Sequence, residues 1–390
     1  MKETIWALAA EQHASMQRHR EHIHRHPELG FREQETSAYV ARQLDALGIP
    51  YTHCEGNYGL VARLKGCGGG RQVGFRADMD ALAMSEANDV PYRSEIPGVM
   101  HACGHDGHTA VLLGLAQTFA THPELLKGDA VLFFQPAEEQ PPGGAKAMVE
   151  QGFADGLDYV FGMHFQGQTP TGTVKTVPGP IMALSDDITI RIHGRGAHAA
   201  DPNLASDALL TAAHAVCAIQ TIVSRMLDPL DNAVVSISSF HSGTDAHNIL
   251  QSEAVLLGTV RCFREEVRDL IESKLHQVLG GVCAQFGTSY TLECEHGYPA
   301  VFNDPDAAAL CMDAMRAIGI DVQLCKPDLG GEDFAYFLNH TPGCFTYVGC
   351  GNQACNAMAP VHTTNFDIDP MALDAMLACE LSCYLSAQNV

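Results

Sequence analysis

Positively charged side chains are scarce in this 390-residue sequence. Lysine and arginine together number 23 against 46 aspartates and glutamates, which gives a formal net charge of −23 at pH 7. Nucleic acids and anionic membranes bind basic surfaces, so this balance argues against both as the main partner. The charge favours solubility but does not identify a substrate, because a pocket can still be locally basic.

Long apolar runs are also lacking. The apolar segment at residues 5–10 is followed at once by EQHASMQRHREH, which is typical of an amphipathic helix and not of a signal peptide. No run approaches the roughly 18 apolar residues of a membrane span. The 14 cysteines are irregularly spaced, so they lack the pattern of a disulfide framework. We therefore expect a cytoplasmic protein with reduced thiols, most of them buried.

The length and the apolar pattern indicate two domains, because 390 residues exceed what one hydrophobic core usually serves. Short apolar strands at 129–135 and 158–165 alternate with helical periodicity, for example over 109–121. This alternation predicts an α/β domain with a mostly parallel sheet and helices on both faces. Ligands of such sheets gather at the carboxyl ends of the strands. The polar residues predicted at strand ends are Asp78, Glu138, Glu139 and His164.

A second unit interrupts this domain. Over residues 182–297 the periodicity predicts strand, helix, strand, strand, helix and strand, a compact α+β unit of the ferredoxin-like βαββαβ order. Helical periodicity resumes after residue 298. We therefore expect residues 1–181 and 298–390 to form one domain and residues 182–297 to be inserted into it.

The segment MHACGHDGHTAVLLGLA, residues 100–116, concentrates metal-binding side chains in one turn ahead of a predicted helix. The side chains concerned are His101, Cys103, His105, Asp106 and His108. A structural zinc site usually has cysteine pairs at CxxC spacing, whereas one cysteine with several histidines suits a catalytic site that keeps open positions. The alternative is a histidine-rich helix start, capped by Thr109 or Asp106.

Two adjacent carboxylates, Glu138 and Glu139, follow an apolar strand in FFQPAEE. Buried carboxylates are rare unless they are paired or bind metal. Because adjacent side chains point in different directions, one can bind a metal while the other serves as a general base. The alternative is the solvated start of a loop. Taken alone, His164 in FGMHF would be a core histidine and His362 in APVHTTNFDID a surface histidine.

Taken together, these motifs resemble the metal-dependent amidohydrolases that include hippurate hydrolase, bacterial aminoacylases and plant auxin-conjugate hydrolases. The resemblance runs almost end to end. The matching segments are IHRHPELGFREQET, RADMDAL, GVMHACGHDGH, QPAEE, GMHF, GRGAHAADP, GTDAHNI, GTVR, LGGEDFAYF and VHTTNFDID. The resemblance implies that residues 182–297 form a lid domain on a catalytic, metal-binding domain.

The resemblance also implies two divalent metal ions per chain. Cys103 is expected to bridge them as a thiolate. The remaining ligands would be His105 and His164 on one metal, and Glu139 and His362 on the other. A mixed sulfur, nitrogen and oxygen ligand set admits Mn, Zn, Co or Ni. Arg76 stands where the wider family has a metal-binding histidine, and His105 is the expected substitute.

Roles in a reaction follow from the same resemblance. Glu138 is expected to act as general base toward the metal-bridging water and then to protonate the leaving amine, while Asp78 orients a ligand. His198, supplied in this family often by the partner subunit, is expected to stabilise the tetrahedral oxyanion. The expected substrate-binding residues are Asn248, Arg261, Gly330 and Gly331. Without the resemblance, Arg261 would be a surface arginine at a strand end.

The leading hypothesis is hydrolysis of an N-acyl or N-aroyl amino acid to a carboxylate and a free amino acid. The enzyme is expected to be a homodimer formed through the lid, or a higher homo-oligomer. The alternative is a dipeptidase or carboxypeptidase that uses the same metals and Arg261. A catalytically inactive relative would lack Glu138 or a ligand, and a structural zinc protein would have no spare base. This sequence contains Glu138 and all five expected metal ligands, which argues against both alternatives.

Overall fold

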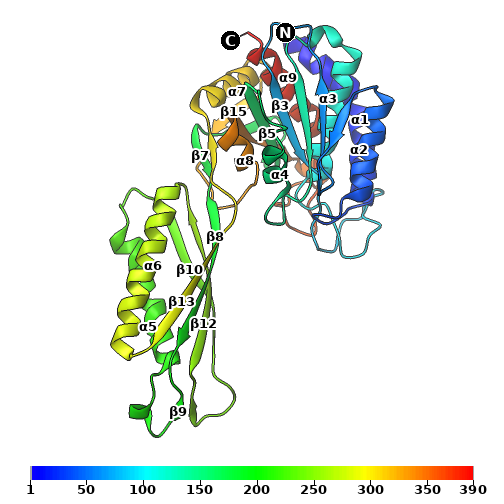
Figure 1. Cartoon of the computed structure of the whole chain (residues 1–390). Coiled ribbons are helices and arrows are strands. Elements are labelled where there is room, and N and C mark those ends of the chain that lie inside the picture. The colour runs from blue at the N-terminus through cyan, green and yellow to red at the C-terminus, as the bar shows by residue number, and fades with distance from the viewer. Residues whose placement is uncertain (1, 390) are drawn as a thin grey trace. The chain divides into compact units, whose positions relative to one another are not determined.

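The structure is a computed structural model that describes residues 2–389, and it divides into two compact units (Figure 1). The first unit extends to Ile181 and also contains Val301–Pro327 and the chain from Glu332 onward. The second unit contains Met182–Ala300 and the short segment Asp328–Gly331. The chain therefore leaves the first unit and returns to it twice.

An eight-stranded, mostly parallel sheet forms the centre of the first unit. Its strands, in spatial order, are β1 (Tyr51–His53), β2 (Leu60–Leu64), β4 (Ala130–Gln135), β3 (Val73–Asp78), β5 (Tyr159–Pro170), β16 (Gly343–Gly351), β6 (Thr173–Thr176) and β15 (Asp321–Leu324). The four central strands β4, β3, β5 and β16 are parallel, whereas β2 and β6 are antiparallel to their inner neighbours. Every residue of β3 and β4 is buried, because parallel strands are covered on both faces.

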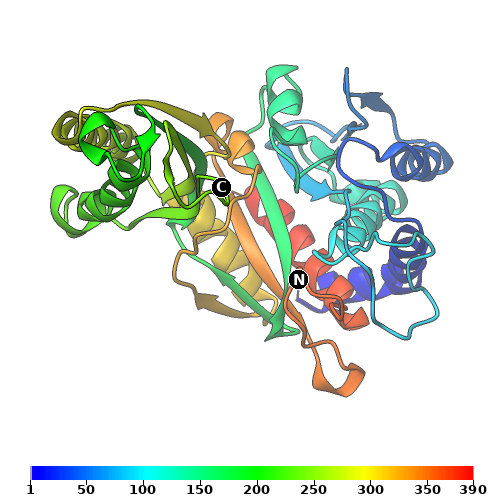
Figure 2. The same ribbon diagram turned by 90° about the horizontal axis from the view of Figure 1, so that it is seen from below.

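Helices cover both faces of this sheet, as the sequence predicts. Along β4 the side chain of Phe134 belongs to the core shared with α1 (Lys2–Arg25), α3 (His105–Thr121) and α9 (Pro370–Ala387). Its neighbour Phe133 points the other way and packs on Phe337 of α8 (Ala335–His340), with ring centroids 4.8 Å apart. Figure 2 shows β5 and β16 side by side with the red helix α9 next to them. The remaining helices of this unit are α2 (Gln34–Ala46), α4 (Gly144–Glu150) and α7 (Pro305–Ala317).

Two predicted element boundaries near the predicted metal-binding residues are wrong. Helix α3 begins at His105 and not at Thr109, because Gly104 adopts the left-handed conformation (φ 94°) that lets the helix start immediately after it. His105 and His108 are therefore in the first turn of α3. His164 lies inside β5 and not at its end, because β5 continues to Pro170.

The second unit has the predicted order of strand, helix, strand, strand, helix and strand. These elements are β8 (Leu184–His193), α5 (Ala208–Thr221), β10 (Ala233–Ser242), β12 (Glu253–Cys262), α6 (Glu265–Phe286) and β13 (Ser289–His296). The four strands form an antiparallel sheet in the order β10-β12-β8-β13. Alternate residues of β8, among them Ile188 and Ile190, are buried in a core with residues of α5 and α6. This alternation is what a sheet covered by helices on one face requires.

Short elements complete the chain. Two-stranded pairings join β7 (Gly179–Met182) to β14 (Val301–Asn303) and β9 (Ala197–His198) to β11 (Ile249–Leu250). Three 3₁₀ turns lie at Pro123–Leu125, Pro202–Leu204 and Gln353–Cys355, and a π-helical turn lies at Ile222–Met226.

Within the described residues, one helical stretch passes the length and composition test for a membrane span. It is Ala208–Met226, which comprises α5 and the following π-helical turn and has a mean hydropathy of 1.3. The stretch is not a continuous apolar run, because it contains His214, Gln220 and Arg225 among its polar residues. The buried residues of α5 recur at intervals of three to four, for example Ala208, Ala212, Ala215 and Ile219, and they belong to the core of the second unit. That spacing is typical of an amphipathic helix packed on a sheet.

Candidate metal centre

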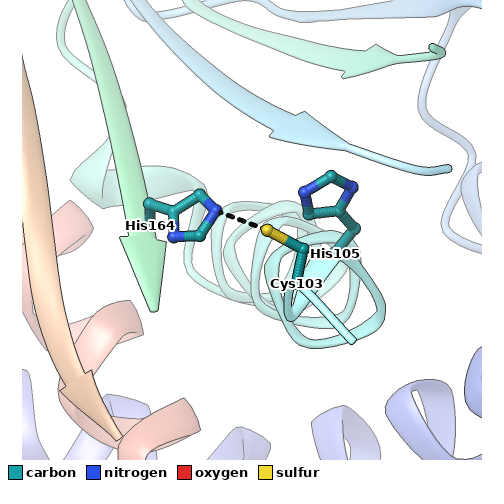
Figure 3. Close-up of side chains that lie close together, drawn as sticks. All are labelled: Cys103, His105 and His164. Carbon is teal, nitrogen blue, oxygen red and sulfur yellow. Dashed lines mark hydrogen bonds between the residues drawn. The ribbon is translucent and has the colours of Figure 1, made fainter. Parts of the chain in front are cut away.

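The structure brings the five predicted ligand residues together in the first unit. The Sγ atom of Cys103 lies 3.2 Å from Nε2 of His164 and 3.2 Å from Nε2 of His362. Nε2 of His362 is in turn 2.9 Å from Oε1 of Glu139. The ligand atoms form two groups, Cys103 with His105 and His164, and Cys103 with Glu139 and His362, each within 4.8 Å. Cys103 is common to both groups, which is the position that a bridging ligand needs. Figure 3 shows the first group.

Two histidines present the same ring nitrogen toward this cluster. Nδ1–H of His105 donates to the carbonyl oxygen of Asp80 (2.9 Å), and Nδ1–H of His164 donates to the carbonyl oxygen of Phe165 (2.8 Å). A carbonyl can only accept, so each ring carries a proton on Nδ1, and in the neutral ring the lone pair lies on Nε2. Metal-binding histidines are usually oriented by such a hydrogen bond from the second nitrogen.

The loop that carries His362 is fixed directly to the cysteine turn. The backbone N–H of His362 donates to the carbonyl oxygen of Ala102 at 2.7 Å. His362 has a φ of 61°, in the left-handed region that non-glycine residues rarely adopt. Such strain persists where the surrounding structure imposes it, often at functional sites. Half of the His362 side chain remains exposed, so this is the solvent-facing side of the cluster.

Asp80 holds the loop that carries the two glutamates. Its two carboxylate oxygens accept hydrogen bonds from the backbone N–H groups of Glu138 (2.9 Å) and Glu139 (3.0 Å). The preceding residue Ala137 has a φ of 54°, and its N–H donates to Oε1 of Glu33 at 2.7 Å. Two buried carboxylates therefore fix the direction in which Glu138 and Glu139 leave the strand end.

Asp78, the last residue of β3, is surrounded by donors. Its Oδ1 accepts a 2.6 Å hydrogen bond from Nδ1 of His108, whose Nε2 accepts from the backbone N–H of Phe165 at 2.9 Å. The Oδ2 atom lies 3.5 Å from Nε2 of His105 and 2.6 Å from a guanidinium nitrogen of Arg76. Asp78 thus links the start of α3 to the strand, and its orienting role remains a prediction.

Arg76 is a buried cation among carboxylates. Its guanidinium also contacts Oε1 of Glu332 and Oδ1 of Asp333, each at 2.9 Å, and donates to Oε1 of Gln135 at 2.7 Å. The ligand atoms of Glu332 and Asp333 lie within 4.8 Å of that of Glu138. The positive charge of Arg76 therefore compensates a group of acids directly beside Glu138.

The electrostatics of the cluster fit a divalent cation. Burial, followed by the charges of Glu139 and Glu138, raises the pKa of the Cys103 thiol well above its usual value. Burial and the neighbouring acids, Glu332 first, likewise raise the pKa of Glu138 well above that of a free glutamate. The buried Nε2 of His105 has no hydrogen-bond partner among the described residues. Ligated metal would supply a positive field for the thiolate and a partner for this nitrogen.

The remaining predicted residues lie in the second unit. His198 in β9 and Asn248 line one cavity of about 500 Å³. Arg261, near the end of β12, donates to the carbonyl oxygen of Val260 at 3.0 Å and to the hydroxyl of Thr259. Gly330 and Gly331 belong to the short segment that the second unit takes from the C-terminal part of the chain. Their contacts with a substrate remain predictions.

Sequence reasoning missed the supporting acids. In RADMD, Arg76 stands two residues before Asp78, and Asp80 stands two residues after Asp78. Residues at this spacing share one face of a strand, so an Arg76–Asp78 ion pair could have been predicted. The pairing of Arg76 with Glu332 spans 256 residues and has no local signal.

Comparison with known proteins gives a consistent result. The profile described as "Peptidase family M20/M25/M40" matches residues 74–381. An N-acyl-L-amino acid amidohydrolase of Geobacillus stearothermophilus is 41% identical over 302 residues, covering 77% of this chain and 81% of the relative. Thermostable carboxypeptidase 2 of Saccharolobus solfataricus is 38% identical over 353 residues, covering 90% of this chain and 89% of the relative.

Solved structures agree. The crystal structure of the Bacillus subtilis protein YXEP, described as a dinuclear metal binding peptidase from the M20 family, superposes with a TM-score of 0.84 at 31% sequence identity. The match covers 97% of this chain and 98% of that one. The similarity thus extends over both units.

Proposed function

From the premise that this chain belongs to Peptidase family M20/M25/M40, we propose that it hydrolyses the amide bond of N-acyl or N-aroyl amino acids. Membership rests on the profile match over most of the chain and on relatives near 40% identity. The chain is thereby a metal-dependent enzyme of an amidohydrolase and peptidase family. The substrate and the role of each residue belong to the proposal.

One observation carries the proposed metal centre. His105 and His164 both donate Nδ1–H to a backbone carbonyl, so Nε2 is the nitrogen of each ring that can bind a metal beside Cys103. We infer that Cys103, His105 and His164 hold one metal and that Cys103, Glu139 and His362 hold the other. The donor set suits Mn, Zn, Co or Ni.

Metal ions bound there would polarise the scissile carbonyl and lower the pKa of water. Glu138 is the general base in this proposal, since it lies next to the ligand Glu139 and is buried. Its raised pKa suits a group that takes a proton from the attacking water, holds it and passes it to the leaving amine. Arg76 limits that rise, because its charge favours the ionised carboxylate.

Residues of the second unit complete the proposal on the substrate side. Arg261 and Asn248 would bind the α-carboxylate of the amino acid, since a guanidinium pairs well with a planar carboxylate. His198 would donate to the oxyanion of the tetrahedral intermediate, and one such donor is worth about 3–4 kcal/mol of barrier. Gly330 and Gly331 would let the backbone approach the substrate closely.

The first test is release of free amino acid from a defined panel. The panel holds hippurate, N-acetyl amino acids, an indole-acetyl amino acid and dipeptides, each assayed with Mn, with Zn and with a chelator. We expect chelator-sensitive cleavage of the acyl amino acids. No cleavage of any compound by protein that carries two metals would refute the proposal.

A carboxypeptidase or dipeptidase activity is the second candidate, because the relative from Saccharolobus solfataricus is named a carboxypeptidase. It would use the same metal centre and Arg261. The two candidates differ in whether the acyl side accepts a charged α-amine. Cleavage mainly of dipeptides in the same panel would favour this second candidate.

We also infer a cytoplasmic enzyme that acts as a homodimer through the second unit, or as a higher homo-oligomer. All 14 cysteines are free thiols, which supports a reducing compartment. The exposed apolar side chains of the second unit, for example Leu204, Phe240 and Ile249, support association with another copy. Light scattering of the purified protein tests the oligomeric state.

A further inference from the structure

A buried polar network connects α1 to the turn that carries Cys103 and His105. Arg20 and His24 lie one helical turn apart on α1 and are 3% and 1% exposed. Both contact the same oxygen of Asp106, through Nε of Arg20 at 3.1 Å and Nδ1 of His24 at 2.8 Å. Asp106 is fully buried and directly follows His105 at the start of α3.

The opposite side of His24 is anchored as well. Its Nε2 lies 3.2 Å from Oε1 of Glu86, and the second oxygen of Glu86 accepts from the backbone N–H of Ser94 at 2.8 Å. His24 is therefore clamped between two buried carboxylates. These charges outweigh the effect of burial, which alone would lower the pKa of His24, and raise it to about 9. At neutral pH the ring carries both protons and donates to both acids.

Arg20 reaches the segment that follows His362. Its guanidinium pairs with Asp367 and donates to the carbonyl oxygen of Ile368 at 3.3 Å. The hydroxyl of Tyr92 donates to the second oxygen of Asp367 at 2.9 Å. Arg20 thus joins Asp106, beside the ligand His105, to Asp367, five residues after the ligand His362.

We propose that Arg20 and His24 are positioning residues that fix the metal-binding turn and the His362 segment relative to each other by holding Asp106 and Asp367. The inference rests on the proposed metal centre. It assigns a role to Arg20 and His24 in the segment RHREHIH of α1, which contains no proposed metal ligand or general base. It also explains why Asp106, within a ligand-rich turn, points away from the cluster and toward α1.

A simpler view is that the network only stabilises the packing of α1 on α3. The chain offers a matched control for that view. His13 lies on the same helix, and its Nδ1 pairs with Asp374 of α9 at 2.8 Å, away from the metal-binding turn. Removing either histidine–carboxylate contact should affect helix packing, but only His24 contacts a residue adjacent to a proposed ligand, namely Asp106 beside His105.

The experiment compares His24→Gln and His13→Gln in the full-length protein. Dissociation constants for Mn²⁺ and Zn²⁺ are measured by competition with a chelator, together with the melting temperature of the metal-free protein. Partners that orient metal ligands typically change affinity 10- to 100-fold when mutated. We expect His24→Gln to weaken metal binding by at least tenfold and His13→Gln to leave it within twofold, and the melting temperatures show how much each contact stabilises the fold.

Two further variants keep the test decisive. Arg20→Lys retains the charge but cannot contact Asp106 and Asp367 in the same way, and it replaces His24→Gln if that variant does not fold. Asp106→Asn combined with His24→Gln should bind metal no more weakly than Asp106→Asn alone, because both act through one contact. Wild-type metal affinity in the folded His24→Gln or Arg20→Lys variant would overturn the inference. Wild-type protein that binds neither metal would overturn the proposed metal centre as well.

Discussion

The hydrogen bonds of Asp80 lead to a prediction about metal affinity. One carboxylate oxygen accepts from the backbone of Glu138 and the other from the backbone of Glu139. In Asp80→Asn one oxygen becomes an amide group that cannot accept, so one of these two N–H groups loses its partner. The side chain is fully buried, so water cannot replace the lost bond.

The expected magnitude follows from that single bond. A hydrogen bond to a charged group contributes about 1.5–3 kcal/mol, which corresponds to a factor of roughly 10 to 150. Because the bond orients the loop of the proposed ligand Glu139, we expect this factor to appear mainly in the affinity for the metal that Glu139 binds. A competition titration with a chelator, followed by kcat at saturating metal, separates weaker binding from slower turnover.

Glu33→Gln is the matched control. Glu33 holds the same loop, but it accepts the N–H groups of Ala137 and Phe31 through Oε1 alone, and Oε2 has no hydrogen-bond partner among the described residues. Glutamine keeps the accepting oxygen, so metal affinity should stay within twofold of wild type. If Asp80→Asn also bound both metals within twofold of wild type, the loop would not depend on these bonds and the reasoning would be refuted.

Three further predictions follow from the same region. Glu138→Gln should lower kcat by 10² to 10⁴ while two metals per chain remain by elemental analysis, and retained turnover would remove Glu138 as the base. Arg76→Met leaves the buried carboxylates of Asp78 and Glu332 without their cation. The free energy of unfolding, measured by urea denaturation, should therefore fall by about 3–5 kcal/mol. A loss below about 1 kcal/mol would contradict the buried ion pairs. Burial, and then the charge of Asp80, raises the pKa of Glu33 to about 7 from 4.5, so the folded protein binds this proton more tightly than the unfolded chain. Stability should therefore fall by up to about 3 kcal/mol as pH rises from 4.5 through 7, and denaturation of metal-free Glu33→Gln at pH 5 and pH 8 should lack this part of the slope.

Local patterns predicted the elements of this fold well. Continuous apolar runs indicated the buried parallel strands, and alternation indicated the antiparallel sheet of the second unit, because each pattern reflects how many faces of a strand are covered. The start of α3 was misplaced, because a glycine in the left-handed conformation allowed helical residues where the sequence suggested a turn. Periodicity cannot detect such a boundary.

Some residues of the candidate site could also be predicted from local sequence, whereas others could not. Cys103, His105, Glu138 and Glu139 stand in short motifs whose residue types already indicate metal chemistry. His164 and His362 could be selected only through resemblance, since each alone looks like an ordinary core or surface histidine. The contacts of Arg76 with Glu332 and of His24 with Asp106 join distant segments of the chain. Such pairings depend on the tertiary fold and leave no periodic signal.

The place of β16 in the sheet has a consequence for biosynthesis. This strand lies between β5 and β6, yet its residues 343–351 are among the last to leave the ribosome. The last strand of the second unit ends at His296, so this unit can complete its sheet before β16 of the first unit has been synthesised. Until then β5, with its apolar side chains, is an open edge, and an open apolar edge can pair with another chain. The proposed ligand His362 emerges later still, so the site proposed for Glu139 and His362 cannot be complete before most of the chain has been made.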